Sequence, residues 1–375
     1  SDLGIRFADG LVWDSDDLSS LGDIKERTLT LALNDSDRFV FLRATDLLDN
    51  SMDTAEKAQW NIIAAAPVST TGFGLDVNDV DSDGDSSEQA FFWVDNLFGD
   101  AQGVIGFLPP SNSVGSGLAF TYTMRHQSGI TYTGSVDVVV SASVAATING
   151  DDRDDILDAT QSYNTQIRTL NGVAGDDILR GGDANDVLNG GDGDDVLNGN
   201  EGGDVIHGNA NNDTFLADWG NDTLAGDAGD DTYHIAYLWG GDQDVIDNTT
   251  AAAIDHDSVV FSHLTDYRQL WFAQSGADLV ATQLDATHNG SVTFKQWYAD
   301  TDNDGQLDDV GTGRVEQFTV QQDDGAAYAM TVDAGFDNLL QAMATFTASN
   351  GAPVSVTTGV EELHTNAGAW IAVNA

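Results

Sequence analysis

Apolar residues recur at every ninth position through the middle of the chain. From residue 172 to residue 234, seven nine-residue units follow one another, each with one apolar or aromatic residue in its eighth place: Leu179, Leu188, Leu197, Ile206, Phe215, Leu224 and Tyr233. Glycine-rich and polar residues precede each of these, so every unit predicts a turn of six residues and a very short strand whose apolar side chain points inward. Two units then make one coil of a parallel β-roll, in which unit n lies beside unit n+2. An outlying copy at 150–157 and a degenerate one at 240–246 extend the predicted roll to residues 146–247.

After the repeats the pattern changes to that of an ordinary globular domain. Apolar runs bounded by Gly, Asp and Asn predict strands at 258–261, 270–272, 278–282 and 291–294. Residues 337–346 predict an amphipathic helix with Asp337 as its N-cap and a single apolar face: Leu339, Leu340, Met343 and Phe346. Because a solenoid end exposes an apolar cross-section, we expect 248–375 to be a β-rich capping domain with a short helix.

Residues 1–145 read as a separate β-rich unit. Strands are predicted at 29–33, 39–43, 119–124 and 135–141, and a helical interruption at 53–63. The expected fold class is therefore mainly β, with an amino-terminal sandwich, a parallel β-roll and a carboxy-terminal cap.

The charge and the composition of the chain exclude several kinds of partner and of chemistry. The 375 residues include 62 acidic and 13 basic ones, for a net charge of −49, and 55 of the acidic residues are aspartate. This charge argues against nucleic acid or an anionic membrane as a partner. The chain has no cysteine, which excludes disulfides, thiolate catalysis and Cys-ligated zinc. It also has no apolar run of about 18 residues that could span a bilayer.

Each unit places an aspartate two residues before its apolar residue and glycines in its turn, which predicts binding of several Ca²⁺ ions by carboxylates and backbone carbonyls. The predicted ligands of the roll are the aspartates Asp155, Asp177, Asp186, Asp195, Asp204, Asp213, Asp222, Asp231 and Asp244, and the glycines Gly172, Gly175, Gly181, Gly190, Gly193, Gly199, Gly202, Gly208, Gly220, Gly226 and Gly229. A metal-free solenoid and a disordered acidic linker are the alternatives, but neither requires a rigid nine-residue aspartate register.

The nonapeptide G-G-x-G-x-D-x-U-x resembles the calcium-binding repeat of RTX proteins, which are exported by type I secretion. The resemblance implies a roll that folds in millimolar extracellular Ca²⁺, with the secretion machinery as a partner and an export signal in the carboxy-terminal cap. Two turns depart from the pattern: Ala217 replaces the first glycine of its unit, and Gly203 stands where Asn or Asp is usual. The sites at these turns are expected to be weaker or differently coordinated.

Two further loops have a D-x-D-x-D-G pattern, with three carboxylates on alternate positions of a tight turn. Both lack the glutamate expected at the twelfth loop position, so neither implies a helix-loop-helix EF-hand. The predicted ligands are Asp79, Asp81, Asp83 and Asp85 in the amino-terminal unit, and Asp300, Asp302, Asp304 and Asp308 in the cap.

Three functions are consistent with parts of this sequence: an enzyme, an adhesin and an ice-binding protein. The zinc-protease motif H-E-x-x-H and the lipase motif G-x-S-x-G are absent from the sequence, so we expect no enzyme here. The third places of the units carry no regular threonine array, which argues against ice binding. The segments 117–129 and 132–141 resemble the last two strands of Ig-like or cadherin-like modules in giant bacterial adhesins.

The resemblance therefore implies the carboxy-terminal portion of a secreted, cell-surface RTX adhesin, with 1–145 as a spacer or as a module that binds a glycan or peptide. An insertion at 46–99 could build such a ligand site around Trp60, Trp93 and the loop at 79–85, but a core role for both tryptophans is the favoured interpretation. The alternative is the non-catalytic secretion and folding part of an RTX toxin or hydrolase.

Overall fold

The computed structural model is mainly β, and its contacts divide the chain into two compact units, Ser1–Tyr163 with Ala174–Ile178, and Asn164–Val173 with Leu179–Ala375. No helix within the described part of the chain is long and apolar enough to cross a membrane. The structure describes residues 5–6, 12–13, 27–32, 40–48, 52, 57–67, 92–95, 104–107, 115–141, 146–160, 167–236, 241–248, 255–284, 290–298, 314–322, 326–332, 334–350, 353, 355–356, 360, 364 and 371–373.

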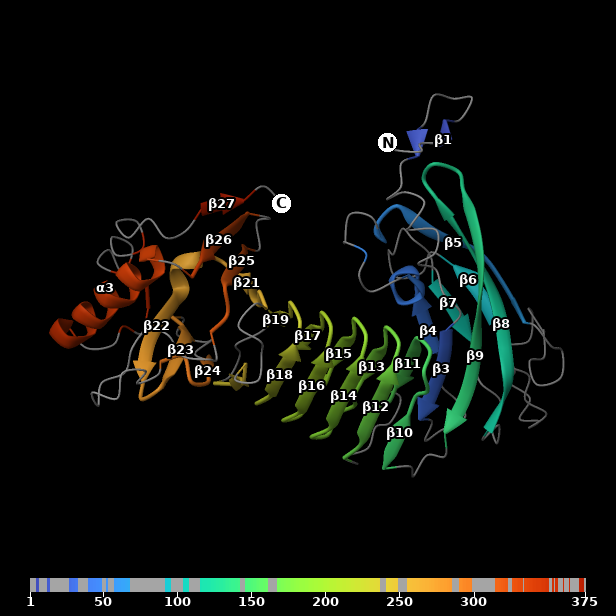
Figure 1. Ribbon diagram of the computed structural model, residues 1–375, viewed down its shortest axis with the longest axis horizontal. Helices are drawn as coiled ribbons and strands as arrows, with labels where there is room; N and C mark the ends of the chain where they lie inside the picture. Colours follow the sequence, from blue (N-terminus) through green and yellow to red (C-terminus); the bar gives the residue numbers. More distant parts are fainter. Residues whose placement is uncertain are drawn as a thin grey trace, which may run out of the picture. The chain divides into compact units, whose positions relative to one another are not determined.

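The nine-residue units form a parallel β-roll with two rows of strands (Figure 1). One row is β12 (Thr169–Ala174), β14 (Val187–Asp192), β16 (Val205–Ala210), β18 (Thr223–Ala228) and β20 (Gln243–Ile246), and the other is β13 (Ile178–Arg180), β15 (Val196–Asn198), β17 (Thr214–Ala217) and β19 (Thr232–Ile235). Val187 pairs with Val205 and Val196 with Thr214, a register of 18 residues in both rows. The predicted stacking of unit n on unit n+2 is confirmed, and all seven apolar residues of the eighth place are fully buried.

The parallel stacking continues past the last repeat. β20 pairs with β24 (Ser291–Phe294), while β19 pairs with β21 (Ser258–Leu264) and β21 with β25 (Gln317–Gln322), all in parallel. Antiparallel strands then close each row: β23 (Asp278–Gln283) and β22 (Leu270–Ser275) beside β24, and β26 (Ala327–Thr331) and β27 (Ile371–Val373) beside β25. The four predicted strands of this region are all present.

The helix of this region, α3, spans Ala334–Asn350 and is longer than predicted. Because it begins three residues before Asp337, that residue lies in the first turn rather than at the N-cap. The buried face is Phe336, Leu339 and Met343, whereas Leu340 and Phe346 are only half-buried. Phe336 joins an aromatic core in which its ring lies 5.3 Å from Phe272 and 5.4 Å from Phe318.

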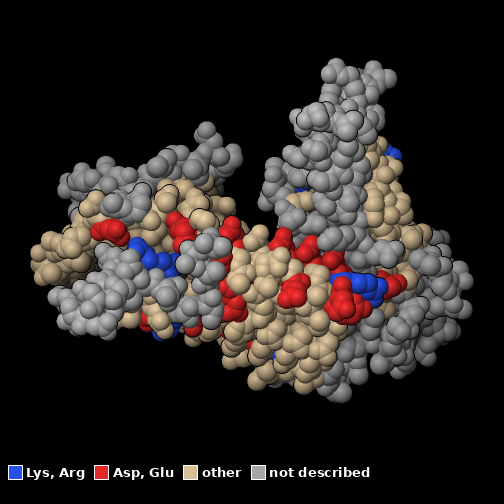
Figure 2. Space-filling model, in the orientation of Figure 1, with Lys and Arg blue, Asp and Glu red and all other residues tan. Residues whose placement is uncertain are grey.

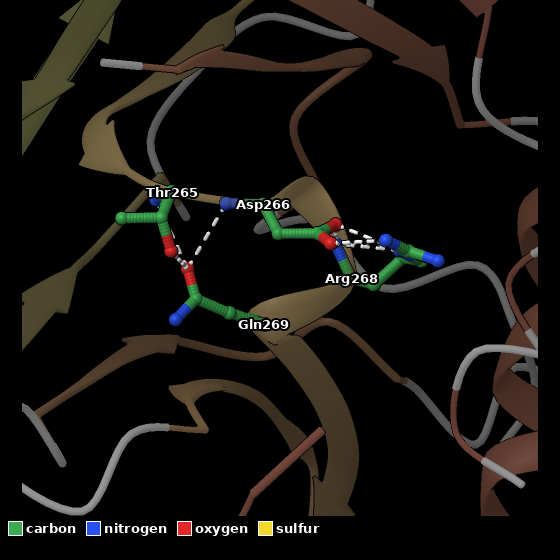
Figure 3. A network of polar contacts seen from close by, with 4 residues as sticks. All are labelled: Thr265, Asp266, Arg268 and Gln269. Carbon is green, nitrogen blue, oxygen red and sulfur yellow. Dashed lines mark hydrogen bonds and ion pairs between the residues drawn. The ribbon is translucent and has the colours of Figure 1, made fainter. Parts of the chain in front are cut away.

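A short 3₁₀ helix, η4 (Tyr267–Gln269), connects β21 to β22 and is fixed by its own side chains (Figure 3). Gln269 Oε1 accepts hydrogen bonds from the backbone N–H groups of Thr265 and Asp266, both at 3.1 Å. The Asp266 carboxylate accepts from the Arg268 backbone N–H at 2.9 Å and from its guanidinium. This reciprocal capping box holds the start of β22 in place.

In the amino-terminal unit, one sheet has the order β11 (Asp155–Asp158), β3 (Arg27–Ala32), β9 (Thr131–Ser141), β8 (Gly115–His126) and β5 (Trp60–Pro67). A three-stranded sheet has the order β4 (Val40–Arg43), β7 (Val104–Phe107) and β6 (Phe92–Asp95). The 3₁₀ helix η2 (Ala44–Leu47) follows β4 in the sequence. The remaining described elements are the paired strands β1 (Ile5–Arg6) and β2 (Val12–Trp13) and the short strand β10 (Thr147–Asn149).

The predicted helix at 53–63 is wrong at its carboxy-terminal end, because Trp60 onward is strand β5, which pairs with β8. Trp60 is only 3% exposed and lies beside His126, which confirms the core role favoured for it. The Trp93 side chain lies outside the described residues.

Candidate calcium-binding ladders

The aspartates in the sixth place of the units form two ladders of hydrogen bonds along the roll. The first ladder is Asp195, Asp213, Asp231, Asp257 and Glu316, and the second is Asp186, Asp204, Asp222 and Asp244. In each ladder the carboxylate accepts a hydrogen bond from the backbone N–H of the preceding member, at 2.7–3.1 Å. Asp155 and Asp177 make the same contact at 2.7 Å within the amino-terminal unit. The predicted aspartates of the roll are therefore brought into register.

These carboxylates are buried, and several of them are only partly hydrogen-bonded. Every aspartate of both ladders is at most 3% exposed, so the acidic patches visible in Figure 2 come from other residues. In Asp204, Asp213 and Asp231 one oxygen accepts the ladder hydrogen bond, whereas the second, Oδ2, has no hydrogen-bond donor among the described residues. A buried carboxylate oxygen without a donor costs free energy and marks a place where a cation fits.

Burial also raises the pKa values of these carboxylates. Desolvation raises the pKa of Asp204 to about 7, that of Asp231 to about 8 and that of Asp213 to about 9. Neighbouring ladder carboxylates raise these pKa values further through charge repulsion, and the backbone hydrogen bonds oppose the rise only in part. The chain alone therefore does not hold these groups in their charged form, which a bound cation would do.

The glycines in the first place leave open the space beside each carboxylate. A Cβ built on Gly208 would lie 2.1 Å from Asp213 Oδ2 and 2.9 Å from the Gly226 carbonyl oxygen. A Cβ on Gly190 would lie 2.1 Å from Asp195 Oδ2 and 2.8 Å from the Gly208 carbonyl oxygen. Carboxylate and carbonyl oxygens are the ligands of a hard cation such as Ca²⁺. Among the residues described here, no three acidic or histidine side chains converge on one point, so a site would take its remaining ligands from carbonyls and water.

The other predicted glycines of the first place repeat this arrangement in part. Gly181, Gly199 and Gly226 each lie against the carboxylate of their own unit, and Gly172 is buried. The glycines of the fourth place serve a different purpose, the close approach of stacked turns. A Cβ on Gly202 would lie 2.5 Å from the Ala184 carbonyl oxygen, and the same place has positive φ in Gly175, Gly193, Gly220 and Gly229.

The two departures from the repeat have visible consequences. Ala217 puts a methyl group where a glycine elsewhere leaves the space beside the carboxylate open, and it is buried. Gly203 interrupts a second set of hydrogen bonds. In this set, the side chain in the fifth place of one unit accepts a hydrogen bond from the backbone N–H of the residue in the fifth place two units later. Asn185 accepts from Gly203 N–H at 3.0 Å, whereas Gly203 has no side chain with which to accept from Asn221.

Sequence reasoning missed two members of the first ladder, Asp257 and Glu316. Asp257 follows Asp231 after 26 residues and Glu316 follows Asp257 after 59, so a nine-residue register does not find them. The Asp257 carboxylate also accepts a hydrogen bond from Asn248 Nδ2 at 2.6 Å, and Asn248 is completely buried. The one sequence signal that could have found Asp257 is the strand predicted at 258–261, because this acidic residue directly precedes it.

The two D-x-D-x-D-G loops, with ligands predicted from Asp79 to Asp85 and from Asp300 to Asp308, lie outside the described residues. Their role as calcium sites stays a prediction.

Comparison with known families agrees with the geometry of the roll. The family model of the RTX calcium-binding nonapeptide repeat, which represents four copies, matches residues 171–206 and again residues 198–233. No curated protein matches the chain. The matched segment contains three aspartates of each ladder: Asp195, Asp213 and Asp231 of the first, and Asp186, Asp204 and Asp222 of the second. The chain thus carries an array of RTX calcium-binding nonapeptide repeats folded as a parallel β-roll, as an RTX calcium-binding protein does.

Proposed function

We propose that this chain is part of a secreted, calcium-dependent RTX adhesin, in which Ca²⁺ drives the folding of the roll after export by a type I secretion machinery. The observation that carries the proposal is the buried pair of ladders, whose carboxylates at Asp204, Asp213 and Asp231 each keep one oxygen without a donor among the described residues.

Through these carboxylates, the folding of the roll depends on the Ca²⁺ concentration around the protein. Without a cation, each thin coil must bury carboxylates that either repel one another when ionised or take up protons, and it gains little apolar burial in return. A ligand that binds only the folded state stabilises it by about 2.7 kcal/mol per site at 100 times its Kd. The roll is therefore expected to be unfolded where Ca²⁺ is scarce and folded where it is plentiful, as outside a cell.

The amino-terminal unit is proposed to serve as an extracellular spacer or a ligand-binding module and not as an enzyme. Its long hairpin, β8 with β9, fits either role. Trp60 is buried in the core, so it offers no exposed face on which a sugar ring could stack. A ligand site in this unit would have to use other residues.

A calcium titration of the whole chain tests the folding step. Far-ultraviolet circular dichroism and hydrogen exchange are followed from excess chelator to millimolar Ca²⁺, with Mg²⁺ as the control ion. We expect the amides of β14 to β19 to be unprotected in chelator, to gain protection cooperatively with Ca²⁺, and to gain little with Mg²⁺. Equal protection of these strands in chelator would overturn the proposal.

The adhesive role is tested separately with the same chain. Glycan and peptide arrays are probed in Ca²⁺ and in chelator, and calcium-dependent binding by a defined ligand class is the expected result for a ligand-binding module. Binding no greater than background would leave the amino-terminal unit as a spacer. Hydrolytic activity in the longer protein that carries this chain would favour a toxin or hydrolase instead.

A further inference from the structure

Arg168 occupies the place of a ladder aspartate. It lies 18 residues before Asp186, and its backbone N–H donates to Asp186 Oδ1 at 2.7 Å, as Asp186 N–H donates to Asp204 Oδ1 at 2.7 Å. Its carbonyl oxygen accepts from Val187 N–H at 2.8 Å, just as the Asp186 carbonyl accepts from Val205 N–H at 2.9 Å. Arg168 is therefore in the sixth place of a coil that precedes the second ladder, outside the residues that match the repeat family.

The side chain of Arg168 is buried. It is 1% exposed and is among the largest fully buried side chains of the described residues. Burial lowers the pKa of Arg168, and the charge of Asp186 opposes that change. An arginine stays protonated in proteins, so this is a permanent positive charge within interaction range of a ladder carboxylate.

Asp186 also differs from its neighbour in the ladder, Asp204. Its Oδ1 accepts from Arg168 N–H, and its Oδ2 accepts from Gly182 N–H at 2.7 Å. Asp204, the next member, has no donor at Oδ2 within the described part of the chain. Both oxygens of the first carboxylate of the second ladder thus have donors within the chain; burial raises the pKa of Asp186, and the charge of Arg168 opposes that rise.

We propose that the guanidinium of Arg168 takes the place of a calcium ion beside Asp186, so that the metal sites of the second ladder begin only after this coil. The inference rests on the proposed function, since it presumes that the later carboxylates bind Ca²⁺. The coil of Arg168 and Asp186 then orders at a lower Ca²⁺ concentration than the later coils of the roll. Its strand β14 is the edge on which the later coils add.

Three variants of the full chain test this assignment. Arg168→Met removes the charge and keeps most of the volume, and Arg168→Asp restores the aspartate of the repeat. Arg180→Met is the control, since it removes the same charge from the ninth place of a unit, where the side chain is only partly buried. Bound Ca²⁺ is counted by native mass spectrometry, and the protection of β14 amides is measured by hydrogen exchange against free Ca²⁺.

Arg168→Met is expected to raise the Ca²⁺ concentration for half-protection of β14 by about tenfold, the factor that corresponds to about 1.4 kcal/mol. Arg168→Asp is expected to bind one ion more than the wild type, and Arg180→Met to behave like the wild type. If the wild type binds Ca²⁺ but Arg168→Asp binds the same number and Arg168→Met leaves the β14 midpoint unchanged, the assignment is overturned. If Arg168→Asp does not fold even in Ca²⁺, the β14 midpoint of Arg168→Met decides alone. A wild type that binds no Ca²⁺ would instead overturn the proposed function.

Discussion

The middle of the roll and its carboxy-terminal end differ in how their buried carboxylates are hydrogen-bonded. Asp213 and Asp257 are both almost fully buried in the first ladder, and both accept a backbone N–H at 2.8–2.9 Å. At Asp257 the second oxygen accepts a hydrogen bond from the buried amide of Asn248, which also donates to the Arg314 carbonyl oxygen at 3.0 Å. At Asp213 the second oxygen has no donor within the described residues.

The difference follows from what each sequence can offer. In the nine-residue units, no side chain of the described residues donates to the second oxygen of Asp204, Asp213 or Asp231, so these carboxylates depend on an ion from solution. The region after the repeats brings Asn248, nine residues before Asp257, and the more distant Arg314 to the ladder. We infer that dependence on calcium is concentrated in the repeats and declines towards the cap.

The largest expected effect concerns pH in the absence of calcium. The pKa values of Asp204, Asp213 and Asp231 are raised to about 7, 9 and 8 by burial, so the folded roll binds more protons than the unfolded chain. Stability of the calcium-free roll is then greatest below the unfolded pKa of about 3.9 and falls as pH rises towards 9. In excess chelator, circular dichroism should show more β-structure at about pH 5.5 than at about pH 9. A calcium-free roll that gains structure as pH rises would contradict this account.

With calcium present, the same carboxylates should be ionised at neutral pH. Protons and Ca²⁺ compete for them, so the Ca²⁺ midpoint should shift to lower concentrations as pH rises. A titration at three pH values checks this direction. Asp257 should contribute less to this pH dependence. Burial raises the pKa of Asp257, but the hydrogen bond from Asn248 lowers it.

The next largest effect is expected for Asp213→Asn. The new amide oxygen can still accept the Asp195 N–H, so the ladder hydrogen bond is kept while the charge is lost. Loss of one charged ligand should raise the Ca²⁺ midpoint by more than about tenfold, since even partners outside the coordination shell are worth about 10–100-fold. The control Asp278→Asn removes an equal charge that pairs with Lys295 at 2.9 Å, away from the ladders. Equal midpoints for the two variants would show that the ladder carboxylate is not a calcium ligand.

Asn248→Ala should make the end of the roll resemble its middle. It leaves Asp257 Oδ2 without its amide donor, and an unsatisfied buried group of this kind costs about 1–3 kcal/mol. Urea unfolding in chelator should report the loss as a lower midpoint for the β21 and β25 amides, measured by hydrogen exchange. If Ca²⁺ restores the lost stability, the end has become metal-dependent. An unchanged midpoint would mean that the Asn248 hydrogen bond contributes no net stability.

Much of this comparison could be predicted from the sequence. Strict nine-residue spacing predicted the roll, its 18-residue register and its buried apolar residues, since each depends only on neighbours at a fixed separation. Asp257, Glu316 and Asn248 could not be predicted in this way. They reach the ladder through connections of irregular length, and only the folded chain brings them together.

Local propensity also failed at two element boundaries. Residues 60–63 looked helical, but pairing with β8 makes them part of strand β5. The helix α3 begins at Ala334, ahead of the Asp337 that looked like its cap, because burial of Phe336 against Phe272 favours an additional turn. In both places tertiary contacts overrode a short local signal.

The smallest expected effect lies in the backbone at the start of the repeats. Val173, in the second place of its unit, has φ +93°, whereas Gly191, two units on, has φ +128° in the same place. A β-branched residue in this region is strained by about 1–3 kcal/mol, and Val173 is 48% exposed, so it loses little apolar burial on replacement. Val173→Gly should therefore stabilise the roll by about 1 kcal/mol in thermal unfolding at saturating Ca²⁺, once the added freedom of glycine in the unfolded chain is subtracted. Val205→Gly is the matched control, because Val205 is 38% exposed and lies in strand β16 without positive φ. It should destabilise the roll by about 1 kcal/mol. Destabilisation of similar size in both variants would show that the left-handed backbone at Val173 stores no strain that glycine can relieve.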